Sequence, residues 1–168
     1  MKIFRTLWIL GLTFLAGGAA FGQTITSTYD EDYGLARLMT YGFKTQERVG
    51  SDPLATDTVM AGKVREALDD ALQSKGYNPP GDGVRPTFFV AFHAAVRDTA
   101  DERGPGPNYI RGTLIVDFHD AETGKLVWRG IATGAVGAEA VDLKLAEEKI
   151  KRAAELLLEQ FGRDLLGF

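Results

Sequence analysis

Three stretches in the second half of the chain alternate between apolar and other residues. In residues 88–97 every even position is apolar, and residues 109–119 and 125–135 again place apolar or small residues at even positions. A period of two is typical of strands that bury one face. We therefore predict three consecutive strands. Their even positions face the core, and their odd positions form a second, mixed face.

The rest of the chain supplies two more strands and two helices. Residues 24–29 and 39–44 are short β-prone runs, and residues 57–75 and 141–161 carry apolar residues at helical spacing. Gly162 is expected to end the second helix. The predicted order is β-β-α-β-β-β-α. It indicates an α+β fold in two layers, with a mainly antiparallel sheet and two helices packed on one face.

The hairpin between the last two strands has a predictable register. Residues 115–130 read IVDFHDAETGKLVWRG, and a three-residue loop at 122–124 gives Gly124 the left-handed position. This loop places Phe118 opposite Trp128 on the buried face. On the other face it places Asp117 opposite Arg129, and His119 opposite Val127. We predict Asp117 and Arg129 to be a structural cross-strand pair.

The first 22 residues have the three parts of a secretory signal peptide. Lys2 and Arg5 precede an apolar run, and a segment rich in small residues ends at Gly22. About 15 apolar residues are fewer than the ~20 that a membrane-spanning helix needs. We predict cleavage before Gln23, with an uncleaved anchor as the rival interpretation. Residues 23–168 then form a single α+β domain, exported to the periplasm or secreted, and soluble.

Charge and composition exclude several classes of protein. The chain has no cysteine, so it has no disulfide, no thiolate metal site and no acylated lipoprotein cysteine. Its net charge of −4 becomes −6 without the two basic leader residues. A mildly acidic domain without a basic patch is not expected to bind nucleic acid or an anionic membrane surface.

The residues show no catalytic constellation. No serine lies in a Gly-x-Ser-x-Gly motif, and neither phosphate-binding glycine motif is present. The two histidines, His93 and His119, are most simply read as ordinary strand residues, although His119 shares a strand face with Asp117. We predict no catalytic, metal-binding or cofactor-binding residue and no cofactor.

The mixed face of the sheet is the candidate partner-binding surface. More apolar residues fall on its odd positions than a solvated face requires. The residues we assign to this candidate face are Phe89, His93, Tyr109, Ile115, Val127 and Ile131.

Four segments resemble one bacterial family of exported domains, domain of unknown function 4136. TYDEDYGLARLMTYGFK is similar to its opening, DPLATDTVMAGKVREALDDALQSKGY to its first helix, RGTLIVDFHDAETGKLVWRGIATG to its hairpin motif, and KIKRAAELLLEQFG to its closing helix. The resemblance implies an α+β domain in the cell envelope and brings no assigned chemistry. Many members are lipoproteins, but this chain lacks the cysteine, so membrane anchoring does not carry over.

The function that we expect is a non-enzymatic binding or assembly module. Its mixed face would bind an envelope protein or a small apolar ligand. The alternative is a small periplasmic hydrolase that uses His93 or His119 with Asp117. A third interpretation is a structural homodimer that pairs edge strands.

Overall fold

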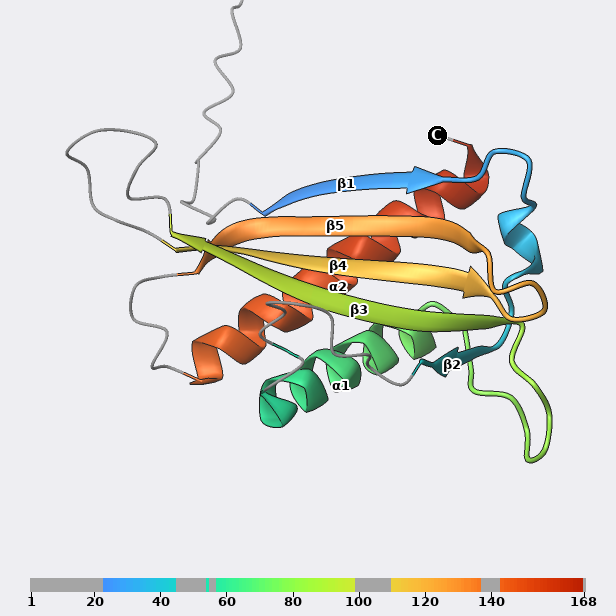
Figure 1. Ribbon diagram of the computed structural model, residues 1–168, viewed down its shortest axis with the longest axis horizontal. Coiled ribbons are helices and arrows are strands. Elements are labelled where there is room, and N and C mark those ends of the chain that lie inside the picture. The colour runs from blue at the N-terminus through green and yellow to red at the C-terminus, as the bar shows by residue number, and fades with distance from the viewer. Residues whose placement is uncertain (1–22, 45–53, 55–56, 99–109, 137–142, 168) are drawn as a thin grey trace, which may run out of the picture.

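A five-stranded sheet and two helices form the part of the chain that the computed structural model describes, residues 23–44, 54, 57–98, 110–136 and 143–167 (Figure 1). The strand order is β1-β5-β4-β3-β2. All neighbouring strands are antiparallel except β2 and β3, which are parallel. The predicted α+β class and element order are therefore confirmed. The strands are β1 (Thr24–Tyr29), β2 (Tyr41–Phe43), β3 (Phe88–Asp98), β4 (Ile110–Asp120) and β5 (Leu126–Val136).

Both helices pack on the same face of the sheet, and α2 crosses behind the strands in Figure 1. The first helix, α1 (Thr58–Ser74), begins where the side chain of Asp57 accepts a hydrogen bond from the Met60 N–H. Its predicted stripe is buried, namely Val64, Leu68, Ala71 and Leu72. A short 3₁₀ helix, η1 (Leu35–Arg37), lies between β1 and β2.

The second helix, α2 (Leu143–Leu166), runs past Gly162, so the predicted end at that glycine was wrong. Tertiary contacts after Gly162 account for the extra turn. The carboxylate of Asp164 accepts hydrogen bonds from Trp128 Nε1 at 2.7 Å and from Gln160 Nε2 at 2.8 Å. The chain leaves the helix at Gly167, whose φ of 75° only glycine adopts freely.

Aromatic rings fill the space between the layers at the hairpin end of the sheet. Phe118 lies at the centre of this aromatic cluster, with its ring centroid 4.8–5.0 Å from those of three neighbours. These neighbours are Phe88, Trp128 and Phe161, so β3, β4, β5 and α2 meet in one tilted and edge-on stack.

The hairpin differs from its predicted geometry at one point. The Asp120 N–H donates to the Lys125 carbonyl, so the loop has four residues instead of three. Near this loop His119 pairs with Leu126, not with Val127 as predicted. A β-bulge then adds one residue to β5 and restores the register, so that Phe118 lies opposite Trp128 and Asp117 opposite Arg129. Gly124 has a φ of 74°, in the left-handed region.

Gly130 makes room for the aromatic cluster. A Cβ atom at this position would lie 2.8 Å from Leu157 Cδ2 and closer still to the indole ring of Trp128. The backbone at Gly130 and the indole ring of Trp128 are both packed against neighbours, so moving either of them costs free energy. The spacing Trp-Arg-Gly therefore has a structural explanation, because the indole lies over the glycine two residues later on the same face.

The first prediction concerns this close approach. Gly130→Ala is expected to lower the free energy of unfolding by about 1–3 kcal/mol, because the added methyl overpacks the core. Gly162→Ala is the matched control. It lies in α2 with nothing within 4 Å of an added Cβ, so it is expected to stabilise by roughly 0.5–1 kcal/mol. Urea unfolding measures both, and equal effects would contradict the explanation.

Candidate binding sites on the two faces of the sheet

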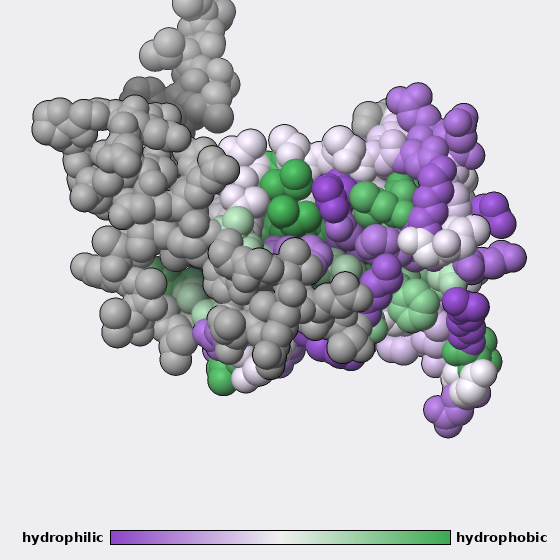
Figure 2. Space-filling view, viewed as in Figure 1, coloured by the Kyte–Doolittle hydropathy of each residue, from purple (hydrophilic) through white to green (hydrophobic). Residues whose placement is uncertain are grey.

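The open face of the sheet is the one on which no described helix packs. Its strands align His93, Ile115 and Ile131 in one cross-strand row, and all three side chains are half-buried. Phe89 lies on the same face near the hairpin, opposite His119. From this side, Figure 2 shows hydrophobic residues next to hydrophilic ones over the strands. Four of the six residues assigned to the candidate face thus lie on it.

The other two residues do not support that surface. Val127 is only 1% exposed and belongs to the core, because the bulge in β5 turns it away from the open face. Its assignment to the partner-binding face was wrong. Tyr109 lies outside the described residues.

Asp117 and Arg129 form an ion pair on the open face. Arg129 Nε and Nη2 each donate to one carboxylate oxygen of Asp117 at 2.7 Å. The side chain of Asp117 is 4% exposed, and the contact raises the pKa of Arg129. A bidentate pair of this kind holds the two strands in register. Each oxygen of the Asp117 carboxylate thus accepts one hydrogen bond from Arg129.

The described contact of His119 is with the backbone of its own hairpin. His119 Nδ1 lies 3.2 Å from the carbonyl oxygen of Gly124, within its own hairpin. His93 lies in the neighbouring cross-strand row, beside Ile115. Within the described part of the chain, no group of three or more metal-binding side chains is placed to hold an ion.

A buried carboxylate at the hairpin has a structural role. Asp120 accepts hydrogen bonds from Tyr33 Oη and from the backbone and hydroxyl of Thr123, each at 2.7 Å. The bonds from Thr123 and Tyr33 lower the pKa of Asp120 to about 2, and burial with the nearby carboxylate raises the pKa of Tyr33 to about 12. A polar pocket of about 350 Å³ lies beside this network, but its one buried carboxylate is already satisfied by the protein.

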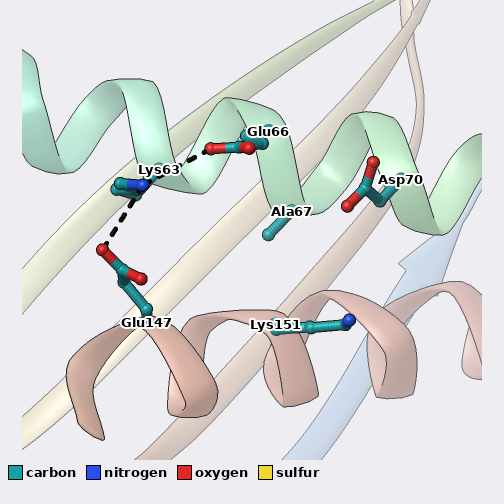
Figure 3. A pocket seen from close by; sticks show the side chains of 6 residues that line it. All are labelled: Lys63, Glu66, Ala67, Asp70, Glu147 and Lys151. Atoms are coloured by element: carbon teal, nitrogen blue, oxygen red, sulfur yellow. Dashed lines mark ion pairs between the residues drawn. The ribbon is translucent and has the colours of Figure 1, made fainter. Parts of the chain in front are cut away.

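The two helices meet along a charged groove. Lys63 of α1 reaches across to Glu147 of α2 at 3.4 Å and also contacts Glu66 at 3.7 Å (Figure 3). The contact with Glu147 raises the pKa of Lys63. All three side chains are well exposed, so these pairs contribute little to stability. The groove is lined mainly by exposed charged side chains, which suit neither an apolar ligand nor a buried catalytic group.

A pocket of about 230 Å³ lies between the layers at the end of the sheet away from the hairpin. We call it the inner-face pocket. Its walls are almost entirely apolar, and they come from both helices and from three adjacent strands. The wall residues used below are Leu54, Met60, Val64, Ala94, Leu114, Ala132, Ala146, Ile150 and Ala153.

The pocket exists because side-chain size falls along the inner face. At the hairpin end this face carries Phe88, Phe118 and Trp128. Along the same strands toward the other end, the inward positions become Ala94 and Ala132, and α2 presents Ala146 and Ala153 there. Small residues on opposing layers leave space that large ones would fill. The decrease in side-chain size along the strands is present in the sequence, whereas the alternation of apolar positions alone does not indicate a pocket.

Among the polar residues that line the inner-face pocket, Gln23 has a buried amide oxygen without a described partner. Gln23, just before β1, donates from Nε2 to the carbonyl oxygen of Lys149 in α2 at 3.1 Å. Its Oε1 is buried and accepts no hydrogen bond from any described residue. Gly134 accommodates it, since a Cβ there would lie 3.1 Å from Gln23 Cγ.

Comparison with known proteins identifies the family. The family described as domain of unknown function, DUF4136, matches residues 25–161. The chain belongs to this family, and the resemblance seen in its sequence is confirmed. No curated protein matches the sequence.

Solved structures are similar to this chain at low sequence identity. A PDZ domain protein from Parabacteroides distasonis superimposes with a TM-score of 0.61 at 13% identity over 83% of this chain. The matched region is 36% of that protein, so the chain spans about a third of its length. PelC, a dodecamer from Paraburkholderia phytofirmans, has a TM-score of 0.48 at 13% identity, over 81% of this chain and 97% of PelC. None of the described helices has the length and apolar character to cross a membrane.

The pKa of Asp120 generates the second prediction. Its folded pKa lies below its ordinary value of 3.8, so the carboxylate stabilises the fold above that value and this contribution is lost as the pH falls toward 2. Asp120→Asn is expected to be less stable than the unaltered chain near neutral pH. The difference in the free energy of unfolding between the two proteins should decrease as the pH falls from about 5 to about 2. Urea unfolding across this range measures it, and a gap independent of pH would refute the assignment.

Proposed function

We propose that the chain is an exported, non-enzymatic binding module that holds a small apolar ligand in the inner-face pocket. The observation that carries the proposal is the pocket itself, with apolar walls contributed by both layers. Ligand sites are typically concave and mostly apolar, with few polar groups. The open face of the sheet has no comparable group of apolar side chains, because its half-buried apolar residues alternate with an ion pair and threonines.

The size of the pocket limits the ligand. A closed apolar cavity of ~150 Å³ can hold a benzene ring, and the inner-face pocket, which is partly open to the surface, has a volume of about 230 Å³. It is smaller than the ~300–1,000 Å³ usual for drug-sized ligands. A substituted single ring or a short alkyl chain therefore fits.

The geometry of the open face supports a non-enzymatic role. Both oxygens of Asp117 are engaged by Arg129, and His119 contacts the hairpin backbone instead of that carboxylate. A hydrolase would need a base oriented toward a free acceptor or nucleophile. The histidine–carboxylate hydrolase is therefore the weaker alternative.

Export is the remaining part of the proposal. Its support is the leader of residues 1–22, with two basic residues, an apolar run and a segment rich in small residues before Gln23. An extracytoplasmic module with a small apolar pocket would encounter its ligand in the cell envelope or outside the cell.

The third prediction tests the pocket with toluene as the probe. Toluene should raise the thermal unfolding midpoint, because a ligand bound only by the folded state stabilises it. Ala94→Leu should abolish this rise, since the larger side chain fills the inner-face pocket. The matched control is Ala91→Leu on the same strand, at an outward position of the sheet.

Circular dichroism in sealed cells measures these midpoints for protein recovered by export, whose intact mass also shows whether the chain begins at Gln23. The proposal requires toluene to stabilise the unaltered chain and Ala91→Leu but not Ala94→Leu. A response of Ala94→Leu equal to that of the unaltered chain would rule out the pocket, as would no response in any of them.

Self-assembly through the open face is the second candidate function. It is favoured by the row of His93, Ile115 and Ile131, which lie in register on three adjacent strands. The fourth prediction is that, if this face pairs two copies, Ile131→Lys converts a dimer into a monomer in sedimentation velocity experiments. Val59→Lys, at an exposed apolar residue of α1 in the helical layer, should leave the dimer intact. A monomeric unaltered chain at high concentration would remove this candidate.

A further inference from the structure

The two edges of the sheet differ in how they are protected. β2 has three residues, and beside it Thr40 pairs with Asn78, whose carbonyl oxygen accepts a hydrogen bond from the Tyr41 N–H. β1, at the opposite edge, has six residues and pairs only with β5 among the described residues (Figure 1). Edge strands of natural proteins are usually short or carry a charged residue, a proline or a bulge that prevents pairing with another chain. The β1 sequence, TITSTY, contains no charged residue and no proline, and its register with β5 is unbroken, so β1 is an open edge.

The free edge of β1 presents the backbone groups of alternate residues. The Asp30 N–H donates to the Val127 carbonyl oxygen at 3.1 Å, which continues the ladder between β1 and β5. Because every second residue of an antiparallel strand bonds to the same neighbour, the threonines of β1 also turn their N–H and C=O groups toward β5. The N–H and C=O groups of Ile25, Ser27 and Tyr29 therefore point away from the sheet.

We propose that two copies of the chain pair antiparallel along β1 and so form one continuous sheet. Centred on Ser27, this pairing sets Ser27 opposite Ser27 of the second copy, and Ile25 opposite its Tyr29. Every outward N–H and C=O group of the strand is then paired, because such opposite residues exchange both hydrogen bonds. The two-fold axis through Ser27 makes one surface complementary to itself, as in most homodimers. No residue of β1 lines the inner-face pocket, so this interface is additional to the proposed function.

Side chains on both faces of β1 suit the same pairing. Ile25 lies opposite Ala132 of the core, so Ile25 and Tyr29 share the face that carries the helices. Tyr29 is 40% exposed, and in the dimer it lies beside Ile25 of the second copy, an aromatic and β-branched pair. On the open face the same register brings Thr26 opposite Thr28, which is also a favourable cross-strand pair. A second copy thus fits this edge without opposing like charges.

Sedimentation velocity of the exported chain tests the pairing with Ser27→Pro. Proline removes the outward N–H at the centre of the interface and leaves the hydrogen bonds to β5 in place, so the edge strand of the monomer tolerates it. The variant should raise the dissociation constant of the dimer at least about tenfold, because each copy loses a hydrogen-bond donor. Tyr29→Lys, at an exposed side chain, should also weaken the dimer, because it sets an ammonium group beside Ile25 of the second copy.

Two further lysine variants are the controls. Val59→Lys changes an exposed residue of α1, and Ile131→Lys changes the open face in β5 and leaves the free edge of β1 unaltered. Both should remain dimeric, and circular dichroism checks that every variant is folded. A monomeric unaltered chain, a dimer that persists in folded Ser27→Pro or Tyr29→Lys, or a dimer lost in Ile131→Lys would overturn the proposal.

Amide hydrogen exchange of the unaltered chain tests the pairing without any variant. In a monomer the amides of Ile25, Ser27 and Tyr29 exchange freely, whereas β5 already protects those of the threonines between them. Exchange at the first three should slow about tenfold when about nine-tenths of the chains are dimeric, because only the monomer leaves these amides open. Equal exchange of these three amides in dilute and concentrated protein would contradict pairing along β1.

Discussion

The indole of Trp128 lies across Gly130, and this contact sets how closely α2 approaches the sheet. The ring packs between Phe118 and Phe161, while its N–H donates to the buried carboxylate of Asp164. One residue therefore joins β5, β4 and α2 through both apolar contact and a hydrogen bond. A larger residue at 130 would push the helix outward, so the close packing at this end depends on the glycine.

Close packing at the hairpin end of the sheet leads to a pocket at the opposite end of the two layers. The aromatic cluster holds the helices against the sheet at the hairpin end. Toward the other end, most inward-facing positions of the sheet become alanine or glycine. Because small side chains of the sheet and of α2 face each other there, a space of about 230 Å³ remains between the layers. Gln23, just before β1, lies in this region, and its Oε1 is the one buried side-chain acceptor without a partner among the described residues. The pocket thus follows from the same packing that stabilises the fold.

Alternation and helical spacing predicted the class, the element order and the Asp117–Arg129 alignment, because burial of one face fixes strand register. Three features needed the tertiary structure. The bulge that buries Val127 depends on how a four-residue loop closes, and α2 continues past Gly162 because Trp128 meets Asp164. The pocket depends on which small residues face one another across the layers. Only the decrease in size from Phe88 to Ala94 was present in the sequence as a signal for it.

The most direct test asks which face of the sheet meets an apolar ligand. Methyl-resolved NMR spectra recorded during a toluene titration report on both faces at once. The account predicts that the methyl signals of Val64, Leu114 and Ile150, which line the pocket, shift together. It also predicts that those of Ile115 and Ile131, on the open face, stay in place. Shifts confined to Ile115 and Ile131, or no shift at all, would contradict it.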